Sequence, residues 1–313
     1  MLRYTTFRIL AAIPTLFLVT ILVFFFIRLV PGDPAAVLVG DIQNIGRLEE
    51  VRRELGLDRS IPEQFFAWIG KIFQGDFGVS IMNQAPVLDT ILDRFAVTAQ
   101  VILIAVLFTT LIAVPAGMIA AWRQNRLTDN IIVVSTIAAM SVPSFWIGLT
   151  LILIFGIELG WLPAVGYVSL FEDFSRGAVY LIMPVAALVL GEVGGVLRMA
   201  RASTIEIMRR DYITHARAKG LSEVAVLSRH AFPNAFAPTL TILGMIIGSL
   251  LGGAAVIETV FTLPGLGRLT IDAISSRDYP MVQGILLVVA VIYVMVNLIT
   301  DLLYPLFDPR VKL

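Results

Sequence analysis

The chain has 313 residues, of which 58% are hydrophobic and only 15% charged, and its mean hydropathy is +0.89. A water-soluble domain could not bury so much apolar surface, so the composition predicts an integral membrane protein. The formal net charge is zero, which argues against nucleic acid as a partner. There is no cysteine, and the two histidines, His215 and His230, are too few for a histidine-rich site, so we expect no metal.

The apolar residues gather in long stretches. A hydrocarbon core about 30 Å thick needs about 20 apolar residues per helix, and six stretches reach this length. We therefore predict an all-α integral membrane protein with about six transmembrane helices, at residues 9–30, 96–122, 131–155, 178–199, 236–261 and 281–306. The first stretch is longer than the apolar core of a signal peptide and lacks a small-residue cleavage site, which favours an uncleaved helix.

The short segments that flank the predicted helices differ in charge. Lys and Arg are concentrated on one side of the alternating topology, and such an excess marks the cytoplasmic side. These residues are Arg3, Arg8, Arg123, Arg126, Arg198, Arg201, Arg209, Arg210, Arg217, Lys219, Arg229, Arg310 and Lys312. We expect a multi-pass protein of the inner membrane whose N- and C-termini are both cytoplasmic.

Residues 31–95, after the first helix, form an external segment that is too short and too polar for a separate catalytic domain. Within it, apolar residues from Phe65 to Phe73 recur at helical spacing, including Trp68 and Ile69. This spacing predicts an amphipathic helix. It lies at the membrane surface or forms a small cap packed on the bundle, and the residues leave both interpretations open.

Several residues inside the predicted helices are candidates for a solute pathway. Pro143 interrupts the third helix between Ser141 and Ser144, whose hydroxyls can bond the freed carbonyls or line a wet cavity. Glu192 is an ionisable group at membrane depth, which is costly and therefore a functional candidate. It lines a cavity or bonds a neighbouring helix, and the sequence does not separate the two.

Other features are better explained by packing. Pro115 and Pro184 also fall inside predicted helices, where single prolines are tolerated. Gly244, Gly248 and Gly252 follow one another at intervals of four residues, which predicts a face where a second helix packs closely. For Glu258 and Asp301, near the ends of their helices, we expect structural roles at the interface.

The loop between the fourth and fifth predicted helices carries the most specific pattern. Asp211 is a suitable N-cap and Gly220 a suitable stop, which predicts a helix of about two turns between them. Ser222 can cap a second helix that runs to about Phe232, where Pro233 ends or kinks it. A short helix of this kind suits docking on a soluble partner, but a solvated basic loop explains the residues equally well.

A resemblance favours docking. The loop resembles the cytoplasmic EAA loop of ABC-importer permeases, which has Glu-Ala-Ala, three residues, Gly and a later Pro. Aligned on Gly220, residues 214–216 (Thr-His-Ala) occupy the Glu-Ala-Ala positions and Pro233 the later Pro, so the glutamate is missing. The form Ala-Arg-Ala-Lys-Gly-Leu at 216–221 is similar to that of the dipeptide/oligopeptide/nickel permease subfamily, where this glutamate is commonly absent.

Further motifs along the whole chain resemble the same subfamily and its B-type subunit. They are Leu-Val-Pro-Gly-Asp-Pro at 29–34, Leu-Gly-Leu-Asp at 55–58, Gly-Asp-Phe-Gly at 75–78, Glu-Leu-Gly-Trp-Leu-Pro at 158–163, Glu-Thr-Val-Phe at 258–261, Leu-Pro-Gly-Leu-Gly-Arg at 263–268 and Arg-Asp-Tyr-Pro at 277–280. The external segment after the first helix is the mark of that subunit.

The resemblance implies a type I ABC importer permease fold in a bacterial inner membrane. The expected parts are a first helix at 1–30, an external segment at 31–95, a five-helix core at 96–307 with the coupling loop at 200–235, and a tail at 308–313. The implied coupling helix comprises Tyr212, Thr214, His215, Ala216, Arg217, Ala218, Lys219, Gly220 and Leu221. The implied partners are a C-type permease subunit, two cytoplasmic ATP-binding subunits and a periplasmic or lipid-anchored substrate-binding protein, all around the lipid bilayer.

We expect no enzymatic activity in the chain itself. A phosphate-binding loop is absent, since Gly70 and Lys71 are followed by Ile72, and no catalytic set of residues is present. The resemblance places ATP and Mg²⁺ on the partner subunits and implies a permease for peptides or related solutes. The alternatives are an importer for glutathione, an opine, a nickel chelate or an oligosaccharide, and a transporter driven by an ion gradient through Glu192. A membrane-embedded enzyme is disfavoured.

Overall fold

The computed structural model describes residues 2–29, 45–54 and 56–307. The helices in these ranges are α1 (Leu2–Leu29), α3 (Ile45–Glu54), α4 (Ile61–Phe73), α5 (Val87–Trp122), α6 (Leu127–Met140), α7 (Ser144–Leu151), η1 (Ile152–Glu158), α8 (Phe174–Met208), α9 (Asp211–Ala218), α10 (Glu223–Ala225), η2 (Val226–Ala231), α11 (Phe232–Val260), α12 (Leu266–Ser275) and α13 (Tyr279–Phe307). Most of the motif at 29–34, residue 55 and the tail at 308–313 lie outside the described residues.

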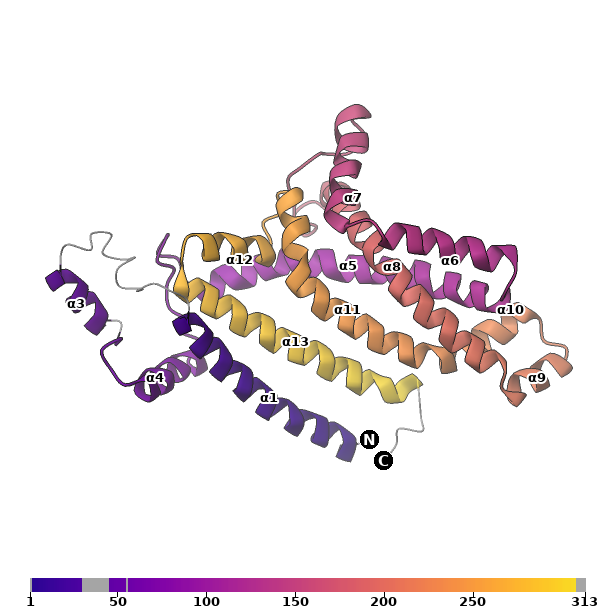
Figure 1. The fold of residues 1–313 in the computed structure, drawn as a ribbon, viewed down its shortest axis with the longest axis horizontal. Coiled ribbons are helices and arrows are strands. Elements are labelled where there is room, and N and C mark those ends of the chain that lie inside the picture. The colour runs from indigo at the N-terminus through magenta and orange to yellow at the C-terminus, as the bar shows by residue number, and fades with distance from the viewer. Residues whose placement is uncertain (1, 30–44, 55, 308–313) are drawn as a thin grey trace.

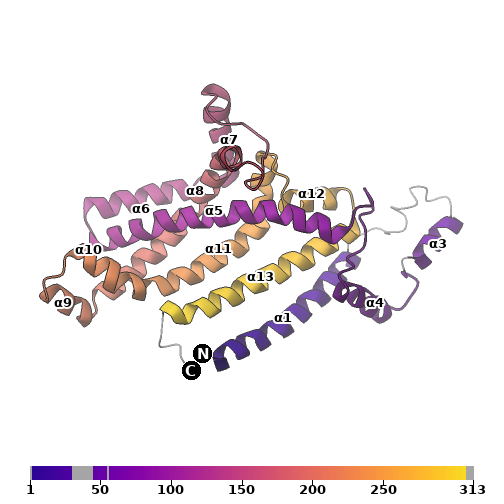
Figure 2. The same ribbon diagram turned by 180° about the vertical axis from the view of Figure 1, so that it is seen from behind.

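The long helices form a bundle. Helix α5 packs on α8, α11 contacts both α8 and α13, and α1 packs on α13. Figure 1 shows these helices lying along the long axis of the molecule, with α9 and α10 at one end and α12 at the other. We call these the α9 end and the α12 end; the start of α1 and the finish of α13 lie toward the α9 end, as the reverse view in Figure 2 also shows.

Five of the six predicted spans are confirmed as single helical runs. Among the described residues, five helical runs are long and apolar enough to cross a membrane: Thr5–Phe26 within α1, α5, α8, Glu223–Val260 and α13. Several extend past their predicted bounds. Helix α8 has 35 residues, about 52 Å at 1.5 Å per residue, so it exceeds a hydrocarbon core about 30 Å thick and projects beyond it. The expected boundary between residues 95 and 96 falls within the unbroken helix α5.

The interruption predicted at Pro143 in the third span is confirmed, and it is a sharp break between two helices. Residues 131–155 belong to α6 and to the α7–η1 segment, which meet at an angle of 90° across residues 141–143. Pro143 has no N–H to donate to the preceding turn, and its ring disfavours a helical conformation for Val142. The Ser141 hydroxyl donates to the Ile137 carbonyl at 2.8 Å and so helps to end α6. Pro115 and Pro184, by contrast, lie inside unbroken helices.

The predicted amphipathic helix is present as α4 and packs against the end of α1. Phe24 of α1 is fully buried, and its ring lies 5.1 Å from that of Phe65 and 5.6 Å from that of Trp68. The opposite face exposes Phe66 and Phe73, which are 70% and 86% exposed. Helix α4 therefore touches the bundle on one side and leaves large aromatic rings uncovered on the other, as a helix at a membrane surface would.

Candidate functional site

Helix α9 starts one residue earlier than a cap at Asp211 would require. Arg210 is the N-cap, with an extended backbone at φ −77° and ψ 146°, so the prediction of Asp211 as the cap is wrong. Asp211 is instead the first helical residue, where a carboxylate interacts favourably with the positive end of the helix dipole.

The other end of α9 closes as the sequence predicts. Gly220 has φ +79°, which a residue with a side chain rarely adopts, and its N–H donates to the Arg217 carbonyl at 2.9 Å. The N–H of Leu221 donates to the Ala216 carbonyl at 3.4 Å, and the two bonds together form a Schellman motif. Gly220 therefore reverses the chain directly after the second turn of α9.

One face of α9 is fixed to the bundle. Ile213 is fully buried and Ala216 is 6% exposed, and both belong to the main apolar core together with Val226 and Ala231 of η2. The remaining residues expected in the coupling helix are exposed; they are Tyr212, Thr214, His215, Arg217, Ala218, Lys219, Gly220 and Leu221. The arrangement presents a short polar surface on a firmly attached helix.

An ion pair holds the turn after α9. The Arg217 guanidinium donates from Nε and Nη2 to the two carboxylate oxygens of Glu223, at 2.8 and 3.1 Å. The Ser222 hydroxyl oxygen accepts from the Ala225 N–H at 3.4 Å, so Ser222 caps α10 as predicted. Pro233 does not end the helical run as predicted. It lies in the first turn of α11, and the π-helical turn η2 directly precedes that helix. Helix α9 is thus joined to α11 through the turn at residues 219–222 and the unbroken helical run from α10 through η2.

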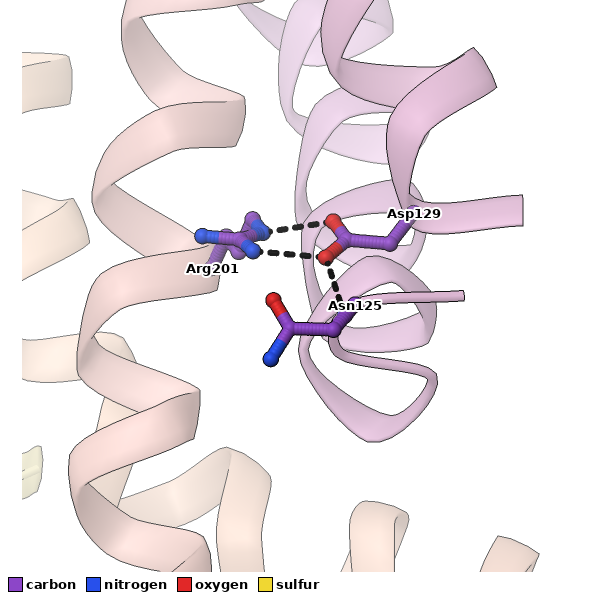
Figure 3. A network of polar contacts seen from close by, with 3 residues as sticks. All are labelled: Asn125, Asp129 and Arg201. Carbon is purple, nitrogen blue, oxygen red and sulfur yellow. Dashed lines mark hydrogen bonds and ion pairs between the residues drawn. The ribbon is translucent and has the colours of Figure 1, made fainter. Parts of the chain in front are cut away.

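A second ion pair, which the sequence pattern did not reveal, joins α6 to α8. Asp129 of α6 is 2% exposed and bonds Arg201 of α8 through both carboxylate oxygens, at 2.7 and 2.6 Å (Figure 3). The backbone N–H of Asn125 also donates to Asp129, at 2.9 Å. The sequence feature that could have indicated this pair is the acid Asp129 at the start of an apolar helix, directly after the basic residues Arg123 and Arg126.

The pathway candidates are partly brought together. The Cβ position of Gly191, next to Glu192, lies 3.7 Å from Cβ of Ser144, so the start of α7 approaches α8 near Glu192. Glu192 is half-buried and makes no hydrogen bond within the part of the chain that the structure describes. Ser141 and Pro143 are exposed at the break. Next to the break is an open apolar hollow of about 200 Å³, lined among others by Val142, Trp146 and Leu190.

The three packing glycines behave differently. A Cβ at Gly244 would collide with Thr300 of α13, and one at Gly248 would collide with the Tyr293 ring. At Gly252 no described residue lies within 4 Å of the added Cβ, so the packing role of this glycine stays a prediction. Four residues advance a helix by about 400°, so each successive glycine turns about 40° away from the first, and Gly252 has left the face that contacts α13.

Two buried carboxylates organise the α12 end. Glu258 is fully buried, accepts from the Thr98 hydroxyl at 2.5 Å and accepts from the Arg268 N–H in the first turn of α12 at 2.9 Å. Thr98 in turn accepts from the Leu266 N–H at 2.8 Å, so α5 and α11 together hold the start of α12. A carboxylate at a helix N-terminus is favourable because it meets unpaired N–H groups and the helix dipole.

Asp278 plays a similar role for the external segment. It is 3% exposed and accepts from the Ser80 hydroxyl at 2.5 Å and from the Ile81 N–H at 3.1 Å. It also precedes α13, where it accepts from the Met281 N–H at 3.4 Å. Asp301, near the other end of α13, pairs with Arg8 of α1 at 2.9 Å in a partly exposed position. These acids therefore join elements that are distant in sequence.

The fold defines the class of protein. A chain of the MetNI methionine ABC transporter, in two inward-facing crystal forms, superposes with TM-scores of 0.59 and 0.55 at 14% identity. The superpositions cover 71% and 70% of this chain and 98% and 96% of the MetNI chains. The chain therefore has the fold of an ABC-importer permease.

The chain belongs to the family of binding-protein-dependent transport system inner membrane components. Residues 113–313 match that family, and residues 1–103 match its N-terminal region. A permease protein of Brucella abortus (strain 2308) assigned to a peptide transport system is 39% identical over 305 residues, 97% of each chain. The glutathione transport system permease protein GsiC of Escherichia coli K12 is 38% identical over 312 residues, 100% of this chain and 99% of GsiC. Membership of this family contradicts the alternative hypothesis of a transporter driven by an ion gradient.

Proposed function

We propose that this permease forms one half of the translocation pathway for peptides or peptide-like solutes and receives its energy through α9. The observation that carries the proposal is the geometry of α9: a two-turn helix, anchored on Ile213, closed by Gly220 and exposed on its polar face. Two ATP-binding subunits would dock on this end of the complex. They, and not this chain, would hold ATP and Mg²⁺.

The charges support a cytoplasmic position for the α9 end. Exposed basic residues surround α9 and the adjoining ends of α8 and η2; they are Arg198, Arg209, Arg210, Arg217, Lys219 and Arg229. Such an excess of Lys and Arg marks the cytoplasmic side of inner-membrane proteins. Both termini would share this side, because α1 begins and α13 finishes toward it.

The connections of α9 indicate how a movement would reach the pathway. Two residues, Arg209 and Arg210, separate α9 from α8, and the Arg217–Glu223 pair attaches it to α10, which continues into α11. A push on α9 would therefore act on two long helices, α8 with Glu192 and α11 with its α13 contacts. Coupling requires that the ATP-bound and ATP-free subunits favour different positions of α9.

The opposite end would face a substrate-binding protein and, with α12 and the segment after α1, would form the entry side. A second permease subunit of the C type would complete the pathway. The two relatives are named for peptide and glutathione transport, and we extend this cargo class to the present chain. Selection among peptides would rest mainly with the binding protein.

The test is reconstitution of the chain with its neighbouring permease, its ATP-binding subunits and its binding protein in proteoliposomes. Labelled alanyl-alanine and glutathione are supplied as separate probes, with and without ATP. We expect ATP-dependent uptake of one of them, and loss of binding-protein-stimulated hydrolysis in Ala216→Arg, which forces a charge into a buried position. Ala216→Ser, which adds a single hydroxyl at the same buried position without a charge, is the matched control. Uptake that continues without any ATP-binding subunit contradicts the proposal.

A further inference from the structure

The Asp129–Arg201 pair joins three helices at one point. Asp129 is the third residue of α6, and its two oxygens are both occupied by the Arg201 guanidinium of α8. The carboxylate also accepts from the backbone N–H of Asn125, in the short turn between α5 and α6 (Figure 3). Asn125 has φ +61°, an uncommon conformation for a residue with a side chain, so the carboxylate helps to hold a turn that the backbone alone disfavours.

Close packing surrounds the pair on both sides. On α5, a Cβ at Gly117 would lie 2.7 Å from the Leu197 carbonyl oxygen and 3.1 Å from the Arg201 nitrogen, so the α5 and α8 backbones touch. On the side of α8 that faces α6, a Cβ on Gly194 would collide with the Met140 side chain of α6 and lie 3.1 Å from the Thr136 carbonyl oxygen. Helix α6 is therefore held to α8 at two levels: by the ion pair near its start and by Gly194 at its end.

The position of α6 gives this attachment a consequence. Helix α6 ends at Met140, immediately before the 90° break at residues 141–143, and the start of α7 lies beside Gly191 and Glu192. Helix α8 continues from Arg201 toward α9. Because α7 also packs on α8 and α11, a displacement of α8 moves both sides of the break together only if α6 follows α8. A slack contact between α6 and α8 would absorb the movement on the α6 side.

We propose that Asp129 and Arg201 are positioning residues that make α6 follow α8, so that displacement of α9 reaches the break at residues 141–143. The inference rests on the proposed role of α9 as the docking helix. A bidentate guanidinium–carboxylate pair suits this task because it fixes direction as well as distance. An apolar contact of the same size can stabilise the helices as well or better, but it has no directional bonds that fix their relative orientation.

The exposed pair Arg210–Glu206 provides the matched control. It lies on the same stretch of chain, its side chains are 53% and 70% exposed, and it joins residues four apart on and just after α8 rather than two helices. Removing that pair with Glu206→Gln changes the local charge without changing how α6 is held.

The experiment uses the complete reconstituted transporter and compares Asp129→Asn, Arg201→Lys, the exchange Asp129→Arg with Arg201→Asp, and Glu206→Gln. The readout is the number of ATP molecules hydrolysed per solute imported, with alanyl-alanine or glutathione as the probe, whichever the unmodified complex takes up. We expect this ratio to rise at least threefold in Asp129→Asn and to rise less in Arg201→Lys. It should return to within twofold in the exchange and remain unchanged in Glu206→Gln.

A structural measurement covers variants that transport too little for the ratio to be determined. Because the chain has no cysteine, nitroxide labels at Ser135→Cys of α6 and Ala202→Cys of α8 are unique within it. The distance between them should stay the same in the ATP-free and vanadate-trapped states of the parent complex, and broaden or shift between these states in Asp129→Asn. The inference is overturned if Asp129→Asn leaves the number of ATP molecules hydrolysed per imported solute unchanged. It is also overturned if this variant has lowered thermal stability but its label distance still does not change between the ATP-free and vanadate-trapped states. A parent complex without ATP-driven uptake instead refutes the proposed function.

Discussion

Substitution of Ile213 by alanine tests whether α9 acts through its anchor. Ile213 is fully buried between α9 and η2, and replacing a buried Ile by Ala typically costs about 2–5 kcal/mol. An eight-residue helix has almost no stability of its own, so the loss falls on the attachment of α9. With about 3 kcal/mol lost, the detached state becomes roughly a hundredfold more populated.

Hydrogen exchange measures this population directly. In the complete transporter in lipid nanodiscs, the amides of residues 216–221, which close α9, should exchange roughly 30- to 1000-fold faster in Ile213→Ala, corresponding to about 2–4 kcal/mol. The conservative Ile213→Val should change exchange by about tenfold or less, because it removes one methyl group. Binding-protein-stimulated hydrolysis should fall with the attachment. Equal exchange in the two variants, or fast exchange with fully coupled uptake, refutes the reasoning.

Three further predictions concern other contacts. Gly117→Ala should lower the melting temperature of the purified chain because the added Cβ meets backbone atoms, whereas Gly252→Ala, which faces open space, should leave it unchanged or raise it. Thr98→Val should destabilise the α12 end by about 1–3 kcal/mol, since it leaves a buried acceptor and an N–H unpaired, and denaturant titration measures this loss while Thr98→Ser shows none. Ser80→Ala should speed proteolytic cleavage within residues 56–86 without altering the melting temperature of the bundle, and equal cleavage rates contradict that role.

The bundle was predictable because span length and charge asymmetry are local properties of a sequence. The stop at Gly220 was predictable for a similar reason, since a left-handed backbone position strongly favours glycine. The 90° break was only partly predictable. Pro143 marks where a helix must be disturbed, but the angle depends on how α7 packs against α8 and α11, which a single segment does not encode.

The polar contacts were the least predictable part. Asp129 and Arg201 are 72 residues apart, and Thr98 and Glu258 are 160 apart, so no spacing rule connects them. Such pairs arise only after the helices have packed. Sequence analysis identified the acid Glu258 as structural from its position near a helix end, but its partners follow from the fold. Asp129 lay just before the helix predicted at 131–155, and Arg201 entered only the charge asymmetry, whereas α6 begins at Leu127 and includes Asp129.

The central claim is that ATP-binding subunits dock on α9. A photoactivatable cross-linker attached at Thr214→Cys, on the exposed face of α9, tests it in a complex that retains ATP-coupled uptake. The same label at Ile274→Cys on α12, which is 58% exposed at the opposite end, is the control. We predict an adduct with an ATP-binding subunit from Thr214→Cys and none from Ile274→Cys. Capture of that subunit only from α12 would contradict the account.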